Sequence, residues 1–208
     1  MVAGATRNTS DTDVISGVSA WELTARMSPR ASVQVLTDAV ENVYSSTRAI
    51  VGPVPEAPWA MHLADKHGYF RWICFDLDSS RGNVRKDAQR LTHWLRQVQI
   101  PYLECLSGPK GGRHVWVSVD HIHGQHVNTI GILAKQLLPT LDTTPLSARG
   151  NGAVRPPLTP HRTSGYSRPL GDVDKLVTTA PVDGAKLLQL EQLLSAAGAA
   201  LPTPHLAG

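Results

Sequence analysis

Residues 69–78 of the chain read YFRWICFDLD, a run of aromatic and β-branched side chains that ends in two aspartates. Such a run, followed by the turn-like residues 79–83 (SSRGN), is typical of a buried strand. On a strand, residues i and i+2 point to the same side, so Asp76 and Asp78 would face one ligand. We therefore expect a pair of carboxylates at the strand end, suited to a hard divalent cation that relieves their repulsion.

Helices and strands alternate after this strand. The apolar spacing predicts a helix over 84–98, strands over 100–106 and 113–120, and a helix over 127–137 that Pro139 ends. Residues 143–171 are rich in Pro, Gly, Ser and Thr, which predicts loop around a short strand near 152–155. Asp183 is a candidate N-cap for a last helix. This order predicts an α+β fold with one mixed sheet.

The segment before residue 69 is less regular. Residues 1–18 are small and polar without periodicity and are expected to form a mobile arm. Ser28-Pro29 resembles a helix start, and the apolar positions 33, 36, 40 and 43 then predict a helix. Three prolines in residues 53–58 predict a loop. We expect an arm at 1–18, a catalytic domain at 19–182 whose motifs lie within 69–170, and a C-terminal helix and tail at 183–208.

Composition excludes several classes of protein. The 208 residues are 41% hydrophobic, a globular proportion, and contain no apolar run of the roughly 18–20 residues that a membrane span needs. The net charge is 20 − 17 = +3. Cys74 and Cys105 both lie in apolar stretches, so we expect reduced core thiols, and two cysteines are too few for a four-thiolate zinc site. The N-terminal residues do not resemble a secretory signal, and we expect a soluble cytoplasmic protein.

Residues 107–114 read SGPKGGRH. Three glycines let the backbone approach a ligand closely, while Ser107, Lys110, Arg113 and His114 add donors suited to an anion. An ordinary hairpin turn would also accept this sequence, and its spacing does not match a P-loop. The segment predicts a turn that binds phosphate.

Residues 155–165 read RPPLTPHRTSG and belong to a stretch, 143–171, without any acidic residue. Its prolines would order the loop in advance, which lowers the entropic cost of binding an anion. A solvated basic loop is the alternative. Arg155 and His161 are the candidate ligands here.

The order FDLD, SGPKGGRHVWV, a lone Asp and RPPLTPHRTSG resembles the archaeo-eukaryotic primase (AEP) superfamily over roughly residues 69–170. The segment from Ile73 to Val119 looks like the polymerase domains of bacterial end-joining ligases and the primase–polymerases of plasmids and phages. The later R-x-P…H…G pattern is closer to the plasmid and phage type. The resemblance implies an RRM-like mixed β-sheet core packed with helices and joined to a small N-terminal α/β unit.

The resemblance also implies roles for single residues. Asp76, Asp78 and Asp142 would hold two divalent ions, Mg²⁺ or Mn²⁺. Asp142 is matched by position alone, and Asp120, Asp172 and Asp174 compete with it. The incoming nucleotide would be held by Ser107, Lys110, Arg113, His114, Arg155 and His161, with His114 also counted among the catalytic residues.

The implied activity is template-dependent nucleotidyl transfer in DNA replication, in which a 3′-hydroxyl attacks the nucleotide α-phosphate and pyrophosphate leaves. The partners would be NTPs or dNTPs and a single-stranded DNA template with its primer, and a replicative helicase is a further candidate. Template contacts are expected from the basic residues Arg81, Arg85, Lys86, Arg149 and Arg168. The sequence lacks a zinc-binding cysteine cluster, which some relatives use for initiation.

Two alternatives remain open. His121-Ile122-His123 matches the histidine pair of HUH-type rolling-circle nucleases, which would use one metal and a tyrosine nucleophile such as Tyr44, Tyr102 or Tyr166. We expect this triplet in a loop after the 113–120 strand. The other alternative is a DNA-binding replication factor that retained the fold and lost activity.

Overall fold

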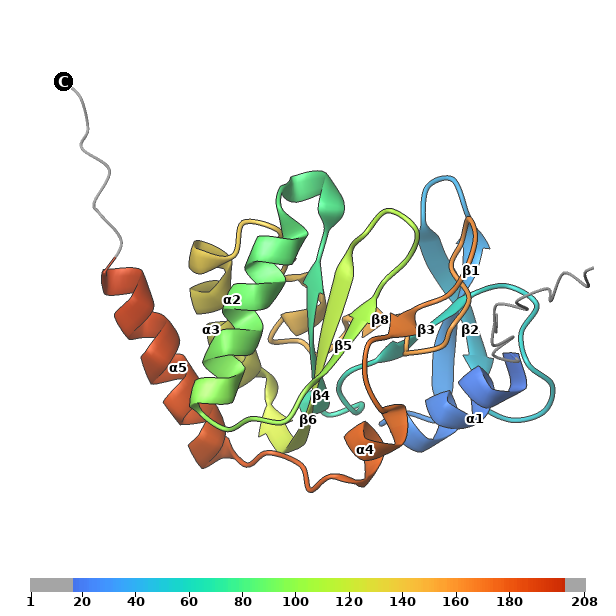
Figure 1. Ribbon diagram of the computed structural model, residues 1–208. Coiled ribbons are helices and arrows are strands. Elements are labelled where there is room, and N and C mark those ends of the chain that lie inside the picture. Colours follow the sequence, from blue (N-terminus) through green and yellow to red (C-terminus); the bar gives the residue numbers. More distant parts are fainter. Residues whose placement is uncertain (1–16, 201–208) are drawn as a thin grey trace, which may run out of the picture.

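The computed structural model describes residues 17–200, which form two β-sheets with helices packed around them (Figure 1). In chain order the elements are α1 (Gly17–Met27), β1 (Ser32–Asp38), β2 (Val43–Ala49), β3 (Trp59–His62), β4 (Tyr69–Leu77), η1 (Ser79–Arg81), α2 (Val84–Gln97), β5 (Leu103–Leu106), β6 (Arg113–His123), α3 (Gly124–Leu137), β7 (Leu141–Asp142), η2 (Thr144–Leu146), β8 (Ala153–Val154), β9 (Arg168–Pro169), α4 (Val173–Thr178) and α5 (Gly184–Ala199).

The larger sheet is RRM-like. Its strands follow the order β7-β4-β6-β5-β9, and the chain runs β4-α2-β5-β6-α3-β7, which is the β-α-β-β-α-β arrangement. The α+β class and the RRM-like core are confirmed. Every pairing between its strands is antiparallel, so the expected mixed character is absent from the described sheets. A parallel contact occurs only as an isolated bridge between Val119 and Val182 in the described chain.

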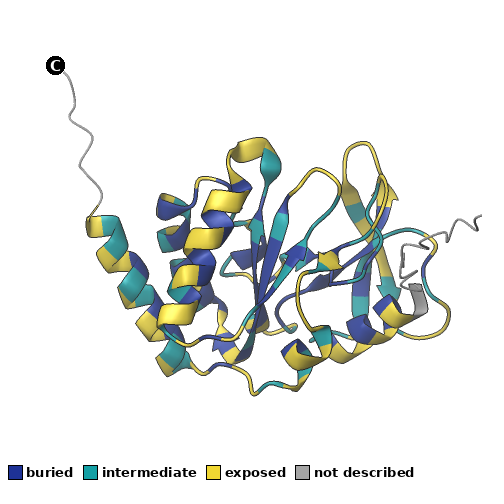
Figure 2. Ribbon diagram, viewed as in Figure 1, coloured by how far each residue is buried: buried dark blue, intermediate teal, exposed yellow. Residues whose placement is uncertain are grey.

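Helices α2, α3 and α5 gather on one side of this sheet (Figure 1). The predicted strand 69–78 is confirmed as β4, and its central residues are buried, as are the inner faces of α2 and α3 (Figure 2). Helix α5 packs against α3 through Leu187, Leu190 and Leu194. The predicted cap is present, since the Asp183 carboxylate accepts a hydrogen bond from Lys186 N–H at 2.9 Å.

A four-stranded sheet of order β2-β1-β3-β8 lies on the other side of the molecule with α1. Trp59 on β3 packs edge-on against Trp21 of α1, with ring centroids 5.2 Å apart, and its indole N–H donates to Thr24 Oγ1 at 2.9 Å. The indole of Trp72 on β4 donates to Met27 O at 2.6 Å. Trp59 thus holds α1 against the N-terminal sheet, and Trp72 joins this unit to the RRM-like core.

The prediction of a helix after Ser28-Pro29 is wrong, because residues 32–49 form the β1–β2 hairpin. Of the apolar positions spaced for a helix, Val33 and Leu36 lie on β1 and are buried. Val40 is exposed in the turn, and Val43 is exposed at the start of β2. Asn42 takes a positive φ of 58°, a conformation that suits Asn in a tight turn. Of the predicted arm, residues 1–16 lie outside the described part, and Gly17 and Val18 belong to α1.

Cys74 and Cys105 are buried free thiols, as expected. Burial raises the pKa of the Cys105 thiol to about 12, which keeps it protonated. In the part of the chain that the structure describes, no helix combines the length and the apolar character needed to cross a membrane.

Candidate active site

Four polar side chains form a row across the larger sheet. In the antiparallel ladders Asp142 lies opposite Asp76, Asp76 opposite His114, and His114 opposite Cys105. Register partners project from the same face of a sheet with Cβ atoms about 5 Å apart. The row therefore brings together residues from β7, β4, β6 and β5 that are distant in the sequence.

This row borders a cleft of about 720 Å³ between the two sheets. Eight of the predicted site residues line it, namely Asp76, Asp78, Ser107, Lys110, His114, Asp142, Arg155 and His161. The acidic groups lie on or just after β4 and β7 and His114 lies on β6, whereas Lys110 comes from the 107–112 turn and Arg155 and His161 come from the 155–165 loop. The structure thus gathers the three sequence motifs in one place.

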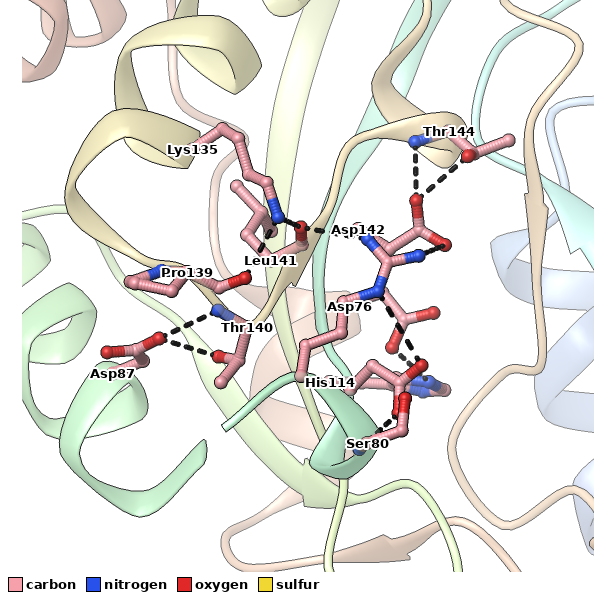
Figure 3. Close-up of polar contacts among 12 residues, drawn as sticks. Asp76, Ser80, Asp87, His114, Lys135, Pro139, Thr140, Leu141, Asp142 and Thr144 are labelled. Atoms are coloured by element: carbon pink, nitrogen blue, oxygen red, sulfur yellow. Dashed lines mark hydrogen bonds and ion pairs between the residues drawn. The ribbon is translucent and has the colours of Figure 1, made fainter. Parts of the chain in front are cut away.

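A network behind the sheet fixes the position of Asp142 (Figure 3). The carboxylate of Asp87, buried on α2, accepts hydrogen bonds from both the N–H (3.0 Å) and the hydroxyl (2.7 Å) of Thr140. The ammonium of Lys135 on α3 donates to the carbonyls of Pro139 (2.9 Å) and Leu141 (2.8 Å). Residues 139–141 are therefore held from two helices immediately before Asp142.

The carboxylates repel one another. Burial, reinforced by the neighbouring Asp142 and Asp78 carboxylates and opposed by Arg155 and Arg81, raises the pKa of Asp76 to about 7. Because Asp76 retains 31% side-chain exposure, a ligand in the cleft can reach it. A cation at this point would relieve the repulsion and favour the ionised form.

Asp76, Asp78 and Asp142 offer the carboxylate oxygens that Mg²⁺ and Mn²⁺ prefer, so the donor chemistry fits the implied ions. Among residues 17–200, however, no three or more His, Cys, Asp or Glu side chains already lie in an arrangement that would hold a metal. Asp142 accepts hydrogen bonds from the N–H (3.0 Å) and hydroxyl (2.8 Å) of Thr144, and Asp78 accepts one from Ser80 N–H (2.8 Å).

His114 and His161, two of the histidines that line the cleft, are neutral at pH 7. Burial, together with Arg155 and His161, lowers the pKa of His114 to about 3, and partial burial beside Arg155, Arg162 and Lys110 lowers that of His161 to about 4. Nε2 of His114 lies 3.5 Å from Oδ1 of Asp76. Both rings can therefore offer hydrogen bonds to an anion, while the positive charge comes from Lys110 and the arginines.

Close contacts hold the glycine-rich turn against the basic loop. A Cβ at Gly108 would come within 2.4 Å of the His161 ring, and one at Gly112 within 2.5 Å of Ser107 Oγ. The Arg155 guanidinium donates to Ser107 O at 2.5 Å and keeps its Nη1 without a hydrogen-bond partner. The glycines are thus needed for packing, and Arg155 has donors left for a ligand.

The N-terminal sheet supplies cleft residues that the sequence reasoning missed. Gln34, Tyr44 and His62 line the wall opposite the aspartates, and Arg162 reaches the β1–β2 turn, where it donates to the carbonyls of Ala39 and Val40. The Tyr44 hydroxyl is buried without a hydrogen-bond partner, and burial raises its pKa. Strand alternation over 43–49 would have identified Tyr44, but no sequence signal pointed to His62.

Arg113 does not belong to the cleft, contrary to the prediction. It precedes His114 on β6, so its side chain points to the opposite face of the sheet. There its guanidinium pairs with Glu104 at 2.8 Å.

The predicted template residues are dispersed. Arg85 and Lys86 are exposed on the first turn of α2, Arg168 is exposed on edge strand β9, and none of these lines the cleft. The Arg149 carbonyl lies beside Gly68, just before β4 begins. Asp76 lies near the other end of this strand, roughly 25 Å from Gly68. Only Arg81 lies among the carboxylates, with Nη2 3.5 Å from Oδ2 of Asp142.

His121 and His123 belong to the end of β6 and not to a loop as expected. His121 Nε2 lies 3.0 Å from Oδ2 of Asp65, and His123 Nδ1 accepts the Gln125 N–H at 3.3 Å to cap α3. The ring beside both histidines is Tyr69, which is none of the three tyrosines considered as nucleophiles. The nuclease alternative has no support from this arrangement.

No protein-family model and no curated protein sequence matches the chain. Among solved structures it is similar to the AEP domain of the cyanophage S-2L primase-polymerase, with a TM-score of 0.54 and 13% identity over 80% of this chain and 93% of that one. The chain has the AEP primase-polymerase fold. The polymerase domain of Mycobacterium tuberculosis Ligase D, in complex with DNA, matches at a TM-score of 0.45 and 12% identity, over 90% of this chain and 94% of that one.

Proposed function

We propose that this chain is a template-dependent nucleotidyltransferase that adds nucleotides to the 3′-hydroxyl of a DNA primer and releases pyrophosphate. The observation that carries the proposal is the convergence of Asp76, Asp142 and His114 in one row, facing Arg155 and His161 across a single cleft. Carboxylates on one side and donors on the other match the needs of a nucleoside triphosphate bound with divalent cations.

Each wall of the cleft has a separate task in this proposal. Arg155, Lys110 and the neutral His114 and His161 bind and orient the triphosphate, with Ser107 beside them. Asp76, Asp78 and Asp142 would hold the ions and so position the 3′-hydroxyl for attack on the α-phosphorus, opposite the leaving pyrophosphate. When bound, the divalent ions would lower the pKa of the attacking hydroxyl and stabilise the leaving pyrophosphate. Positioning and electrostatics supply the rate enhancement.

Incorporation of labelled nucleotides on single-stranded DNA, with and without a primer, in Mg²⁺ and in Mn²⁺, tests the proposal. Asp76→Ala should abolish incorporation, and Asp78→Ala should act in the same way. Asp120→Ala is the matched control, since Asp120 is exposed and lies outside the cleft. Products without a primer would indicate a primase, and products only with a primer would indicate a polymerase.

An active Asp76→Ala protein would refute the assignment of the carboxylates. DNA binding without incorporation by the wild-type protein would favour the inactive replication factor instead.

A further inference from the structure

The carboxylates of the cleft already have a positively charged neighbour. Asp78 and Asp142 each use Oδ1 for a local hydrogen bond, to Ser80 and to Thr144 respectively. The other carboxylate oxygen of each residue, Oδ2, lies near Arg81. Nε of Arg81 is 3.8 Å from Oδ2 of Asp78, and its Nη2 is 3.5 Å from Oδ2 of Asp142. The oxygens that remain available to a cation are therefore the oxygens that Arg81 approaches.

The backbone explains why Arg81 reaches this position. Asp78 caps η1, and the N–H of Arg81 donates to the carbonyl of Asp78 at 3.1 Å, so the short helix turns the arginine back over its own cap. The guanidinium also donates to Leu141 O at 3.5 Å, next to Asp142. It thus bridges the end of β4 and the start of β7.

The bridge is loose. Both ion-pair separations exceed the roughly 2.7–2.9 Å of a charge-assisted hydrogen bond. The Arg81 side chain is 42% exposed, and exposed ion pairs of this kind are weak. Arg81 therefore neutralises the carboxylates by proximity and can move into solvent at the cost of these two weak ion pairs.

Resting on the proposed function, we infer that Arg81 is an internal counter-ion that competes with divalent cations for Asp78 and Asp142. A guanidinium and a divalent ion that both approached these Oδ2 atoms would repel each other at short distance. Binding of a metal ion displaces the guanidinium, and this displacement lowers the intrinsic metal affinity. Arg81 has this role in place of the template contact that the sequence suggested.

Mn²⁺ binding to the full chain, measured by electron paramagnetic resonance of the free ion without nucleotide or DNA, tests the inference. Arg81→Gln removes the charge and keeps a polar side chain, and it should tighten Mn²⁺ binding roughly tenfold. Arg81→Lys retains the charge and should bind Mn²⁺ more weakly than Arg81→Gln. Arg96→Gln, an equal loss of charge on exposed α2 surface, should leave the affinity unchanged.

Thermal unfolding supplies a second readout that does not depend on activity. Without divalent cations, Arg81→Gln should unfold at a lower temperature than the wild type, because the carboxylates lose their counter-ion. Saturating Mn²⁺ should raise its unfolding temperature by more than that of the wild type. Asp142→Asn should reduce the Mn²⁺ response in both backgrounds.

Unchanged or weaker Mn²⁺ binding by Arg81→Gln would overturn the inference, as would a failure of both proteins to bind Mn²⁺. Tighter binding in Arg96→Gln would show a general effect of net charge and would equally overturn it. If Arg81→Gln binds Mn²⁺ more tightly but the wild-type protein incorporates no nucleotide, the counter-ion role stands and the proposed function fails.

Discussion

Asp142 on β7 lies directly opposite Asp76 on β4 in an antiparallel ladder. Like charges opposite each other destabilise a sheet, because their side chains project from the same face at short distance. Strand β7 has only two residues, so the pairing depends on the contacts of Asp87 and Lys135 just before it. The fold therefore maintains an unfavourable acidic pair at the edge of its cleft, and the divalent ions of the proposed function would relieve this repulsion.

Burial of Asp76, reinforced by the neighbouring carboxylates, predicts a pH-dependent gain in stability for Asp76→Asn. The pKa of Asp76 is raised from 3.8 to about 7, so folding favours the protonated carboxyl and wild-type stability is lost as pH rises through this window. Asparagine imitates the protonated form. Without divalent cations, the variant should be more stable than the wild type by about 2 kcal/mol at pH 8, a difference reduced to allow for the partial exposure of Asp76. At pH 4 the two proteins should have almost the same stability.

Denaturant unfolding of both proteins between pH 4 and pH 8 measures this difference. Asp120→Asn, an exposed and distant substitution, should show no such trend. A stability difference that does not grow with pH would contradict the raised pKa of Asp76.

Asp87→Ala should weaken both the fold and the site. The substitution leaves the buried N–H and hydroxyl of Thr140 without their acceptor, which should cost about 2–4 kcal/mol in the free energy of unfolding. Nucleotide incorporation should also fall, since β7 carries Asp142. Denaturant unfolding and the incorporation assay check the two effects, and Gln89→Ala on the exposed side of α2 is the control. Unchanged stability would show that the network does not hold β7.

Gly108→Ala should weaken nucleotide binding by displacing His161. An added Cβ would lie 2.4 Å from the imidazole, a distance at which one of the groups must move. We expect roughly tenfold weaker binding of a fluorescent nucleotide, about 1.4 kcal/mol. Adding Gly108→Ala to His161→Ala should then have little further effect, because the clash is gone. Additive losses in the double variant would refute this mechanism.

Single-stranded DNA binding should weaken steeply with added salt, because Lys and Arg side chains that contact phosphates release counterions. Arg85→Gln and Lys86→Gln should each reduce the slope of log K against log salt by about 0.7. Fluorescence anisotropy over a range of salt concentrations measures the slope, with Arg96→Gln at the other end of α2 as the control. An unchanged slope in both variants would remove this surface from the DNA path.

Local pattern was sufficient to predict several elements of the larger sheet and its helices, whereas the RRM-like arrangement was implied by the family resemblance. The apolar strand at 69–78, the amphipathic helix that follows it and the glycine-rich turn at 107–112 each depend on neighbours within a few residues. The hairpin at 32–49 was missed because Val33, Leu36, Val40 and Val43 also fit a helical period. Pairing with β3, which is distant in sequence, favours the strand.

The sequence by itself determined which residue types could carry the chemistry, since the FDLD and SGPKGGRH motifs and the basic loop are local patterns. Only the tertiary structure decided which of them meet. Strand register placed Asp142 opposite Asp76 and excluded Arg113 from the cleft by the alternation of side chains along β6. Chain packing likewise directed Arg81 toward the carboxylates and brought Tyr44 into the cleft. Register and packing depend on contacts between distant segments, which no window of sequence contains.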